Sequence, residues 1–429
     1  MTATAEETVD GVEAKPEIRT RAQVRRERTL GGFYLALAIF TLYVFAIGSE
    51  GSSTFRLVRA SDRFPDFPNL VVPAFATSLV IALVFLVFGV LQLTRGFGKR
   101  TNVVLGVAAA LFVFSFLTWA AADQSFSLVS MLDAAVVASV PLTIGALAGI
   151  LCERVAVINI AIEGMLLGGA FTGVVVASAF TSVWFGVLAA VLTGGALAWV
   201  LAVMSIRYRV DQIITGVVIN IFVLGLTSFL TVQVLAANAD LNSAPRVPMW
   251  DVPLLSDIPL VGGALFQQSL FVYFMLVLVV VTTYALFRTR WGLRSRSVGE
   301  HPKAADTVGI NVYRMRYLGV MLGGLVAGLG GAFFTLGRVG RFDENLTAGR
   351  GFIALAAMIF GRWHPVGALS AALVFGFADA LANKLAILGT GIPSEFLLMS
   401  PYLATLIVVA GVVGKSRPPA ADGQPYIKE

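Results

Sequence analysis

The chain has 429 residues, of which 57% are hydrophobic and 13% charged, with a net charge of +6 and a mean hydropathy of +0.85. A soluble protein of this length cannot bury so much apolar surface, and several apolar runs exceed the ~18 residues of a spanning helix. The runs are continuous, whereas a membrane β-barrel shows alternating segments of about ten residues. Composition therefore predicts an all-α polytopic membrane protein, in which net charge reports orientation and not binding to nucleic acid.

Residues 1–30 are polar and end in a basic cluster, which predicts a disordered cytosolic tail held inside by its arginines. The region 31–127 then holds three predicted transmembrane helices, at Gly31–Gly48, Leu70–Leu93 and Asn102–Ala122.

Six further spans are predicted at Leu128–Leu151, Val155–Phe180, Val183–Ile206, Ile213–Ala236, Leu270–Phe287 and Tyr317–Leu336. Residues 237–269 form a long external loop, of a size to carry short surface helices. The basic segment Arg288–Arg316 is placed in the cytosol both by the positive-inside rule and by the alternation of spans. The two assignments agree, which supports this topology.

The pattern changes after Phe352. A short apolar run ends at the sequence GRWHP, residues 361–365, and a second run covers Val366–Leu381. Runs this short are typical of re-entrant or broken helices. With a last span at Phe396–Val413, the chain has ten crossings if 352–381 is a re-entrant hairpin, and twelve if both pieces cross. Both termini, including a tail at 415–429, are then cytoplasmic.

Two polar residues, Asn159 and Glu163, interrupt the apolar segment that begins at Val155. In a continuous helix they share one face, and Glu163 lies roughly 12–13 Å deep, near the middle of a ~30 Å hydrocarbon slab. An ionised carboxylate there costs about 2.5–3.5 kcal/mol. Either the pair lines a water-filled route or it only hydrogen-bonds to adjacent helices. Glycine pairs such as Gly164–Gly168 and Gly324–Gly328 predict close helix packing.

The cytosolic basic segment contains its own helix signal. Pro302 stands at a first-turn position, KAADTV follows, and Gly309 ends the pattern. Either this segment is only an orientation signal, or its short helix sits in a cleft of a partner and transmits motion.

Motifs for chemistry are lacking in the sequence. GVVGKS at 411–416 resembles a phosphate loop, but Val409 stands where the motif needs glycine. One cysteine excludes an intrachain disulfide, and His301 and His364 lie too far apart for a metal cluster. No catalytic or metal-binding residues are assigned, and the chain is not predicted to be an enzyme. A shared G-x-L-x-A-x-L pattern at 184–197 and 364–378 is consistent with two internal repeats.

From about Met131 to Val413 the chain resembles the inner-membrane permeases of binding-protein-dependent ABC importers, in the branch of ribose-type sugar and branched-chain amino-acid permeases. Three stretches carry the likeness: 153–171, 299–316 and 351–381. The last two are most similar to the nucleoside (simple-sugar) subgroup, which works with a binding lipoprotein. The family motif is usually ERSGVVNIGIEG, and here Val155, Ala156 and Ala161 replace a small residue and two glycines.

The resemblance implies a permease core at 128–414 in a bacterial plasma (inner) membrane, with the region 31–127 as an addition. It implies an ATP-driven importer of nucleosides or a related simple sugar. The partners are a cytosolic ATPase subunit, a second permease subunit in a heterodimer, an extracytoplasmic binding lipoprotein and membrane lipid. This chain binds no cofactor, because ATP and magnesium belong to the ATPase. The loops 237–269 and 338–350 receive the binding protein.

Residue roles follow from the same resemblance. The ATPase coupling helix is Glu300–Ile310, and its assigned residues are Glu300, His301, Ala304, Ala305, Gly309 and Ile310. The substrate pathway is assigned to Asn159, Glu163, Gly164, Phe352, Ala356 and Trp363. The alternative is a proton-coupled secondary transporter with Glu163 as the carrier, and a membrane protein with a purely structural role is a third, weaker hypothesis.

Overall fold

The computed structural model describes residues 21–58, 67–388, 399 and 417–428. The predicted last span at 396–413, the GVVGKS sequence and residues 1–20 of the predicted N-terminal tail lie outside the described residues. The chain divides into two compact units. The first comprises Met1–Phe55 and Asn69–Phe126, and the second comprises Arg56–Pro68 and Ser127–Glu429.

The first unit is built from three long helices and a small sheet. Its helices are α1 (Arg21–Phe40, extended by the π-helical turn Thr41–Ala46), α2 (Ala74–Thr94) and α3 (Thr101–Ala120), with a 3-10 turn at Gly98–Arg100. Its strands are β1 (Ser52–Arg56), β2 (Leu70–Pro73) and β3 (Ser125–Ser127), in the order β2-β1-β3. The Phe45 ring lies 5.5 Å from the Trp119 ring and 5.6 Å from that of Phe112, so aromatic packing joins the helices.

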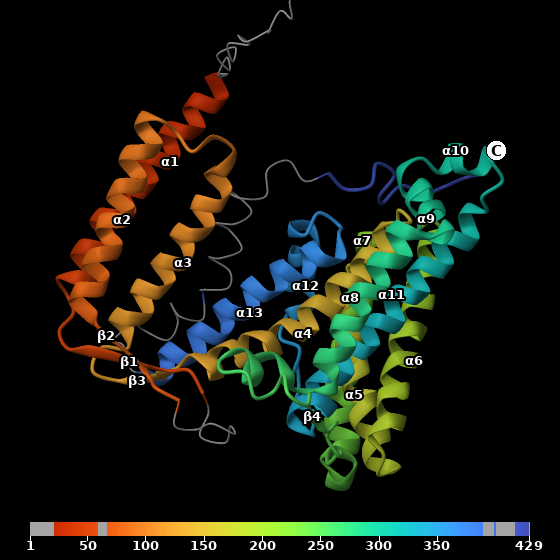
Figure 1. The fold of residues 1–429 in the computed structure, drawn as a ribbon. Helices are drawn as coiled ribbons and strands as arrows, with labels where there is room; N and C mark the ends of the chain where they lie inside the picture. The colour runs from red at the N-terminus through yellow and green to blue at the C-terminus, as the bar shows by residue number, and fades with distance from the viewer. Residues whose placement is uncertain (1–20, 59–66, 389–398, 400–416, 429) are drawn as a thin grey trace, which may run out of the picture. The chain divides into compact units, whose positions relative to one another are not determined.

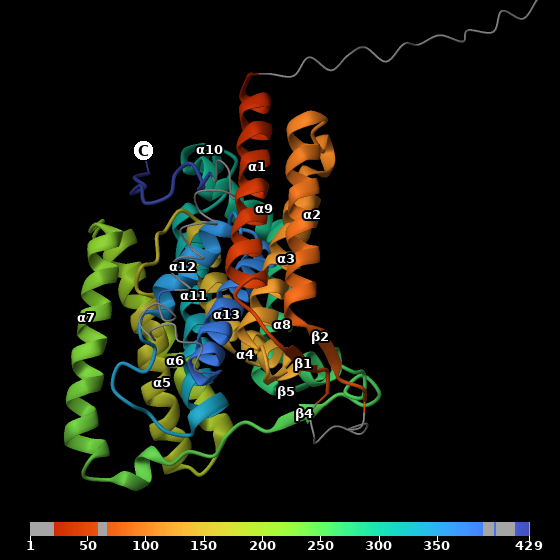
Figure 2. The same cartoon turned by 90° about the vertical axis from the view of Figure 1, so that its left-hand side faces the viewer.

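The second unit is a helix bundle (Figures 1 and 2). Its helices are α4 (Leu128–Glu153), α5 (Ile162–Ala179), α6 (Val183–Ala202), α7 (Gln212–Leu230), α8 (Leu270–Arg288), α9 (Arg290–Glu300), α10 (Pro302–Thr307), α11 (Val312–Phe334), α12 (Arg350–Phe360) and α13 (Pro365–Leu388). Short helical turns follow at Val203–Arg207, Thr231–Leu235, Ala239–Asn242, Gly262–Phe266 and Thr335–Val339. α4 and α5 are largely buried, whereas α7 exposes most of its residues at the edge of the bundle (Figure 2).

Glycines set the close helix contacts, as their spacing predicts. A side chain at Gly328 would overlap the Ala190 carbonyl, and one at Gly194 would overlap the Gly324 carbonyl, so α6 and α11 pack backbone to backbone. A side chain at Gly169 would come within 2.8 Å of the Gly328 carbonyl oxygen, which brings α5 onto α11. Such small-residue contacts provide the van der Waals packing that holds helices together in lipid.

The described residues contain ten helices long and apolar enough to cross a membrane. This confirms the all-α polytopic fold. α12 has 11 residues and, at 1.5 Å per residue, is only about 16 Å long, so it cannot span alone. α13 has 24 residues and is longer than the predicted run at 366–381. The region is therefore a broken helix followed by a full-length one, and not a hairpin of two short pieces.

The predicted continuous helix Val155–Phe180 is wrong. α4 ends at Glu153, α5 begins only at Ile162, and residues 154–161 form an irregular connection, called here the motif loop. Asn159 lies in this loop, so it does not share a helix face with Glu163. Ala156 has φ +62°, a left-handed conformation that no helix of L-residues adopts.

The loop 237–269 has more structure than the sequence predicts. Besides two short helical turns it contains an antiparallel hairpin of β4 (Met249–Asp251) and β5 (Gln267–Ser269), with Trp250 paired to Gln268. The strands are too short to produce a recognisable alternation in sequence.

Candidate functional site

The second half of the motif loop obtains hydrogen bonds from side chains of α7. The Ile158 N–H donates to Gln212 Oε1 at 2.7 Å, and Asn220 Nδ2 donates to the Ile160 carbonyl at 2.9 Å. Asn220 Oδ1 also accepts from the Gly164 N–H at 2.7 Å. Backbone groups within a bilayer need protein partners where the helix is interrupted, and two polar residues of α7 supply them.

Glu163 caps the N-terminus of α12. Its Oε1 accepts from the Thr347 hydroxyl at 2.6 Å and from the Gly349 N–H at 2.8 Å, and its Oε2 accepts from the Gly351 N–H at 2.5 Å. The first N–H groups of a helix lack partners within it and carry partial positive charge. A carboxylate there is therefore satisfied as a capping group, although it is only 8% exposed.

The other end of α12 is held by residues at the start of the same motif. Arg154 Nε and Nη2 both donate to the Trp363 carbonyl, at 3.1 and 2.7 Å. The Trp363 indole N–H donates to Glu153. Trp363 lies in the turn directly after α12, where free carbonyls are found. Three residues of the motif, Glu153, Arg154 and Glu163, therefore hold the broken helix at both of its ends, and we call this arrangement the α12 clamp.

The six predicted pathway residues do not form one surface. Asn159 is fully buried, with Nδ2 facing the sulfurs of Cys152 and Met165 at 3.4 and 3.7 Å and with Oδ1 unpartnered. Glu163 and Trp363 belong to the clamp, and Gly164 packs on Asn220.

The remaining pair of predicted pathway residues lies on one side of α12. Phe352 is 48% exposed and Ala356 is half-buried, and with Ile359 they follow helical spacing along one face. The opposite face is buried, with Ala354 against Gly145 and Met358 against Gly149 of α4. Among the described residues, α12 thus presents a narrow apolar face on which Phe352 is the most exposed side chain.

The predicted cytosolic helix is present as α10, and α9 precedes it. His301 Nδ1 accepts from the Ala304 N–H at 3.1 Å, and Pro302 occupies the first turn. At the other end Gly309 has φ +82°, its N–H donates to the Asp306 carbonyl, and the Ile310 N–H donates to the Ala305 carbonyl. This is a Schellman end.

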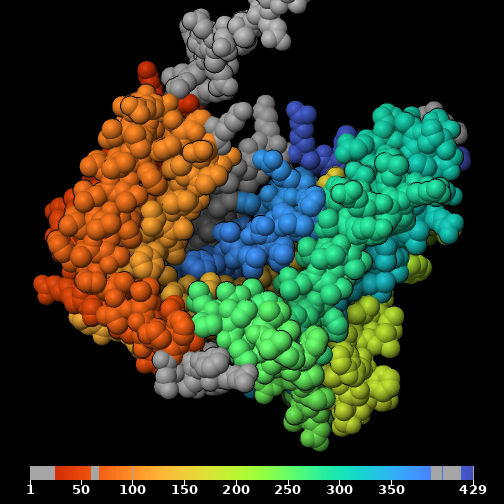
Figure 3. All heavy atoms as spheres, in the orientation of Figure 1, coloured from red at the N-terminus to blue at the C-terminus, as the bar shows by residue number. Residues whose placement is uncertain are grey.

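The predicted range Glu300–Ile310 is therefore wider than the helix. Glu300 is the last residue of α9, and Ile310 follows the end of α10. Ala305 is only 3% exposed and packs inward, whereas Ala304 is exposed. The outward face of α10 thus includes Ala304, and Val308 directly after the helix is exposed as well. The α9–α10 hairpin stands at one end of the second unit, at the upper right of Figure 3.

Charged groups gather where this hairpin meets the clamp. Arg154 and Arg296 lie over the Phe287 ring at 5.6 and 5.0 Å. Burial lowers the pKa of Arg154, and the positive charge of Arg296 lowers it further. The His364 ring lies 4.7 Å from the Phe287 ring. Burial lowers the pKa of His364, and the positive charge of Arg154 lowers it further. Cations on an aromatic face are stabilised without a counter-charge.

Asp422 is hydrogen-bonded to Glu153. Burial raises the pKa of Asp422 to about 6, while the bond to Glu153, the Gly423 N–H and the charge of Arg316 act in the opposite direction. A hydrogen bond between two carboxyl groups needs a proton on one of them. A C-terminal residue thus belongs to the same cluster as the clamp.

Sequence reasoning missed several of these residues: Glu153, Arg154, Gln212, Asn220, Thr347 and Asp422. Asn220 carried a usable signal, since a polar residue in the middle of an apolar run is costly and needs a partner. Within the described residues, no group of three or more His, Cys, Asp or Glu side chains is placed to hold a metal ion.

A bundle of helices long enough to span a membrane, with a broken helix held at both of its ends, is typical of the transmembrane subunit of a transporter. Residues 130–413 match the family described as "Branched-chain amino acid transport system / permease component", and the chain belongs to this family. It is a multi-pass inner-membrane protein, the permease subunit of an ABC transporter whose ATPase is a separate subunit.

Three relatives illustrate the similarity. Guanosine ABC transporter permease protein NupQ of Bacillus subtilis is 41% identical, over 70% of this chain and 96% of its own length. Nucleoside ABC transporter permease protein NupC of Lactococcus lactis is 42% identical, over 68% and 94%. Putative glucose ABC transporter permease protein TsgC13 of Haloferax volcanii is 36% identical, over 58% and 76%. No solved structure matches the chain significantly. The alternative of a proton-coupled transporter is not favoured.

Proposed function

We propose that the chain forms the membrane pathway of an ATP-driven importer of nucleosides. The observation that carries this proposal is the similarity to two permeases named for guanosine and for nucleosides, at 41% and 42% identity over nearly their whole lengths. The glucose relative is less similar and covers less of its own length, which ranks a simple sugar second.

The pathway is proposed to run along the exposed face of α12. Phe352 offers an aromatic ring of a kind on which a nucleobase stacks, and Ala356 and Ile359 continue the same face. Glu163 and Trp363 act behind this face by holding α12 in place, whereas Asn159 and Gly164 fix the motif loop and α5. A second permease subunit of different sequence is proposed to complete the pathway along this face.

α10 is proposed as the coupling helix that docks in the cytosolic ATPase subunit. Its capped ends fix its geometry, and Ala304 on its outward face permits close approach. ATP and magnesium are bound by that subunit, and this chain binds no cofactor. An extracytoplasmic binding lipoprotein delivers the substrate to the loops 237–269 and 338–350.

Uptake of radiolabelled guanosine by cells that lack the chain, and by the same cells complemented with it, tests the substrate. We expect complementation to restore uptake, and other nucleosides to compete while glucose and branched-chain amino acids do not. Restored uptake of glucose without any uptake of guanosine would overturn the nucleoside assignment and leave the permease class untouched.

A further inference from the structure

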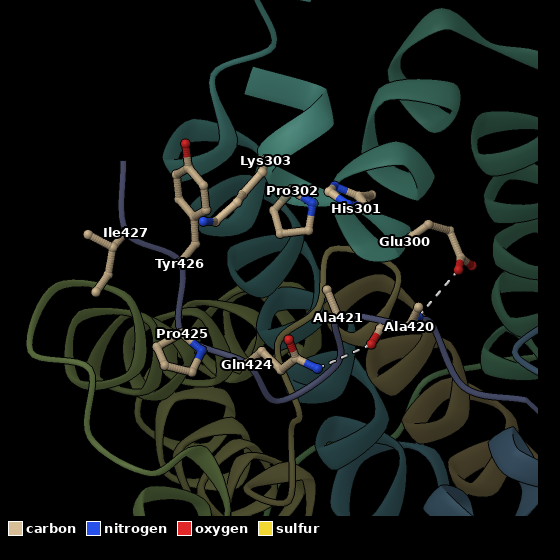
Figure 4. Close-up of a pocket in the computed structure, with 10 residues that line it drawn as sticks. All are labelled: Glu300, His301, Pro302, Lys303, Ala420, Ala421, Gln424, Pro425, Tyr426 and Ile427. Atoms are coloured by element: carbon tan, nitrogen blue, oxygen red, sulfur yellow. Dashed lines mark hydrogen bonds between the residues drawn. The ribbon is translucent and has the colours of Figure 1, made fainter. Parts of the chain in front are cut away.

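The C-terminal residues 417–428, called here the strap, are fixed against the α9–α10 hairpin. The Ala421 N–H donates to the Gly299 carbonyl at 3.0 Å. Figure 4 shows the second bond, from the Ala420 N–H to Glu300 Oε2 at 3.3 Å. Arg316 Nη1 donates to the Gln424 carbonyl at 2.9 Å. These bonds tie the strap to α9 and α11.

A tight turn joins the middle of the strap to the motif loop. Gly423 has φ +73°, and a side chain there would come within 2.8 Å of Ile158 Cδ1. The turn places Asp422 beside Glu153, the residue of the clamp that accepts from Trp363. The strap is therefore anchored to the same cluster that holds α12.

The end of the strap runs along α10. The Tyr426 ring packs on the Tyr313 ring with centroids 5.4 Å apart, and the Tyr313 hydroxyl donates to the Tyr426 carbonyl. Lys428 Nζ lies 3.5 Å from Asp306 Oδ1 of α10. Tyr426 is only 6% exposed, so this end is seated by packing as well as by charge.

A cleft of about 610 Å³ lies between the strap and the start of α10 (Figure 4). One wall carries Glu300 to Lys303, and the other carries Ala420, Ala421 and the residues from Gln424 to Ile427. One wall comes from the α9–α10 hairpin inside the permease core and the other from the strap beyond it, so only the docked strap creates the space between them.

Apolar side chains stand exposed beside this cleft. Ile427 is 53% and Val308 is 74% exposed. Both lie outside the helices that are long and apolar enough to span a membrane. Ile427 is next to Lys428 in sequence, and Val308 is two residues from Asp306. Because Lys428 and Asp306 form an ion pair, both apolar residues lie at the same end of the hairpin. Exposed apolar residues on an otherwise charged surface are typical of a protein interface.

We propose that the strap and α10 together form a single docking surface, and that the cytosolic ATPase subunit of this transporter occupies the cleft. This inference rests on the proposed docking role of α10, whose outward face continues into the cleft. In this arrangement the strap, which is distant from α10 in sequence, supplies half of the contact with the ATPase, and Ile427 lies at its edge.

Co-purification of the ATPase with tagged full-length permease, co-expressed with its partner subunits, tests the proposal. Ile427→Asp puts a charge on an exposed residue, so the fold is preserved and the interface is not. We expect at least a tenfold lower ratio of ATPase to permease. The matched control is Ile258→Asp, since Ile258 is 42% exposed on the loop 237–269, and it retains the full ratio.

Ala304→Glu separates this inference from the function on which it rests. Loss of the ATPase in both Ala304→Glu and Ile427→Asp supports the common surface. Loss in Ala304→Glu with full retention in Ile427→Asp overturns the role of the strap and leaves the docking helix standing. Full retention in Ala304→Glu overturns docking by α10 itself.

A photo-crosslinking amino acid at position 427 tests contact directly. In the assembled transporter we expect a covalent adduct with the ATPase subunit, and none from the same group at position 258. An adduct at 427 with lipid, or with the second permease subunit alone, would contradict the proposed occupant.

Discussion

At the scale of single residues, the charged groups of the motif act on the backbone of one broken helix. Glu163 satisfies N–H groups at the start of α12, and Arg154 satisfies a carbonyl just past its end. The costly mid-membrane carboxylate was evident in the sequence, and both of its interpretations stood open. The geometry supports hydrogen bonding to neighbouring elements, because three donors surround Glu163.

Ala156 is a residue whose replacement should stabilise the protein. Its φ of +62° costs an L-residue about 1–2 kcal/mol, a cost that glycine avoids. We expect Ala156→Gly to raise the free energy of unfolding by about 1 kcal/mol and to raise the midpoint of thermal unfolding of the purified protein.

Ala161→Gly is the matched control in the same loop. Both alanines are fully buried, so both substitutions remove a buried methyl group, but Ala161 has φ −72° and glycine relieves no backbone strain there. Equal stabilisation by both substitutions would contradict the explanation by backbone strain.

Asp422 should make docking of the strap depend on pH. Its pKa is about 6 when docked, and an exposed aspartate has a pKa of about 3.9. The docked state therefore binds more protons between these values, so docking weakens as pH rises from about 4 to 6 and stays weaker above. Hydrogen exchange at the Ala421 amide, corrected for its intrinsic rate, should accelerate over this range.

Asp422→Asn cannot titrate and should give a corrected exchange rate that is flat with pH. Constant protection of the Ala421 amide in the unmodified protein between pH 4 and 7 would contradict the shifted titration of Asp422.

At the scale of elements, hydrophobic runs located most helices but not where the backbone breaks. Length and composition predicted α8 and α11, and Pro302 with Gly309 predicted α10, because those signals are local. The break at 154–161 depends on Gln212 and Asn220, more than fifty residues away, so no window of sequence reveals it. The clamp and the strap could not be predicted from the sequence either, because their hydrogen bonds join residues more than a hundred positions apart.

Gly351 tests the contact between the clamp and α12. A side chain there would lie 2.6 Å from the Glu163 Cα and 2.7 Å from its Oε2, so Gly351→Ala must push α12 away from its cap. Loss of these hydrogen bonds costs about 1–3 kcal/mol. We expect uptake to fall at least tenfold while the protein still reaches the membrane, as measured by transport and by quantitative blotting.

Gly225→Ala in α7 is the control, because a side chain at Gly225 meets nothing within 4 Å. It should leave uptake unchanged. Normal uptake in Gly351→Ala would show that the position of α12 is not critical for transport.

At the scale of the whole molecule, the order of elements in the second unit repeats. α4 leads through the motif loop to α5 and α6, and α11 leads through the irregular stretch before Arg350 to α12 and α13. The sequence echo between 184–197 and 364–378 falls on α6 and α13, the corresponding members. Glu163, at the start of α5, caps the start of α12, so the two interrupted helices meet at their N-termini, as half-helices do in transporters built from repeats.

The central claim is that this chain forms a nucleoside pathway whose energy comes from a separate ATPase. Its most direct test is uptake of radiolabelled guanosine into proteoliposomes that hold the permease, its partner permease, the ATPase and the binding lipoprotein, with ATP on the ATPase side. We predict accumulation that requires both ATP and the ATPase and that persists when a proton ionophore is added. Accumulation by the permease subunits alone, driven by an imposed proton gradient, would contradict the account.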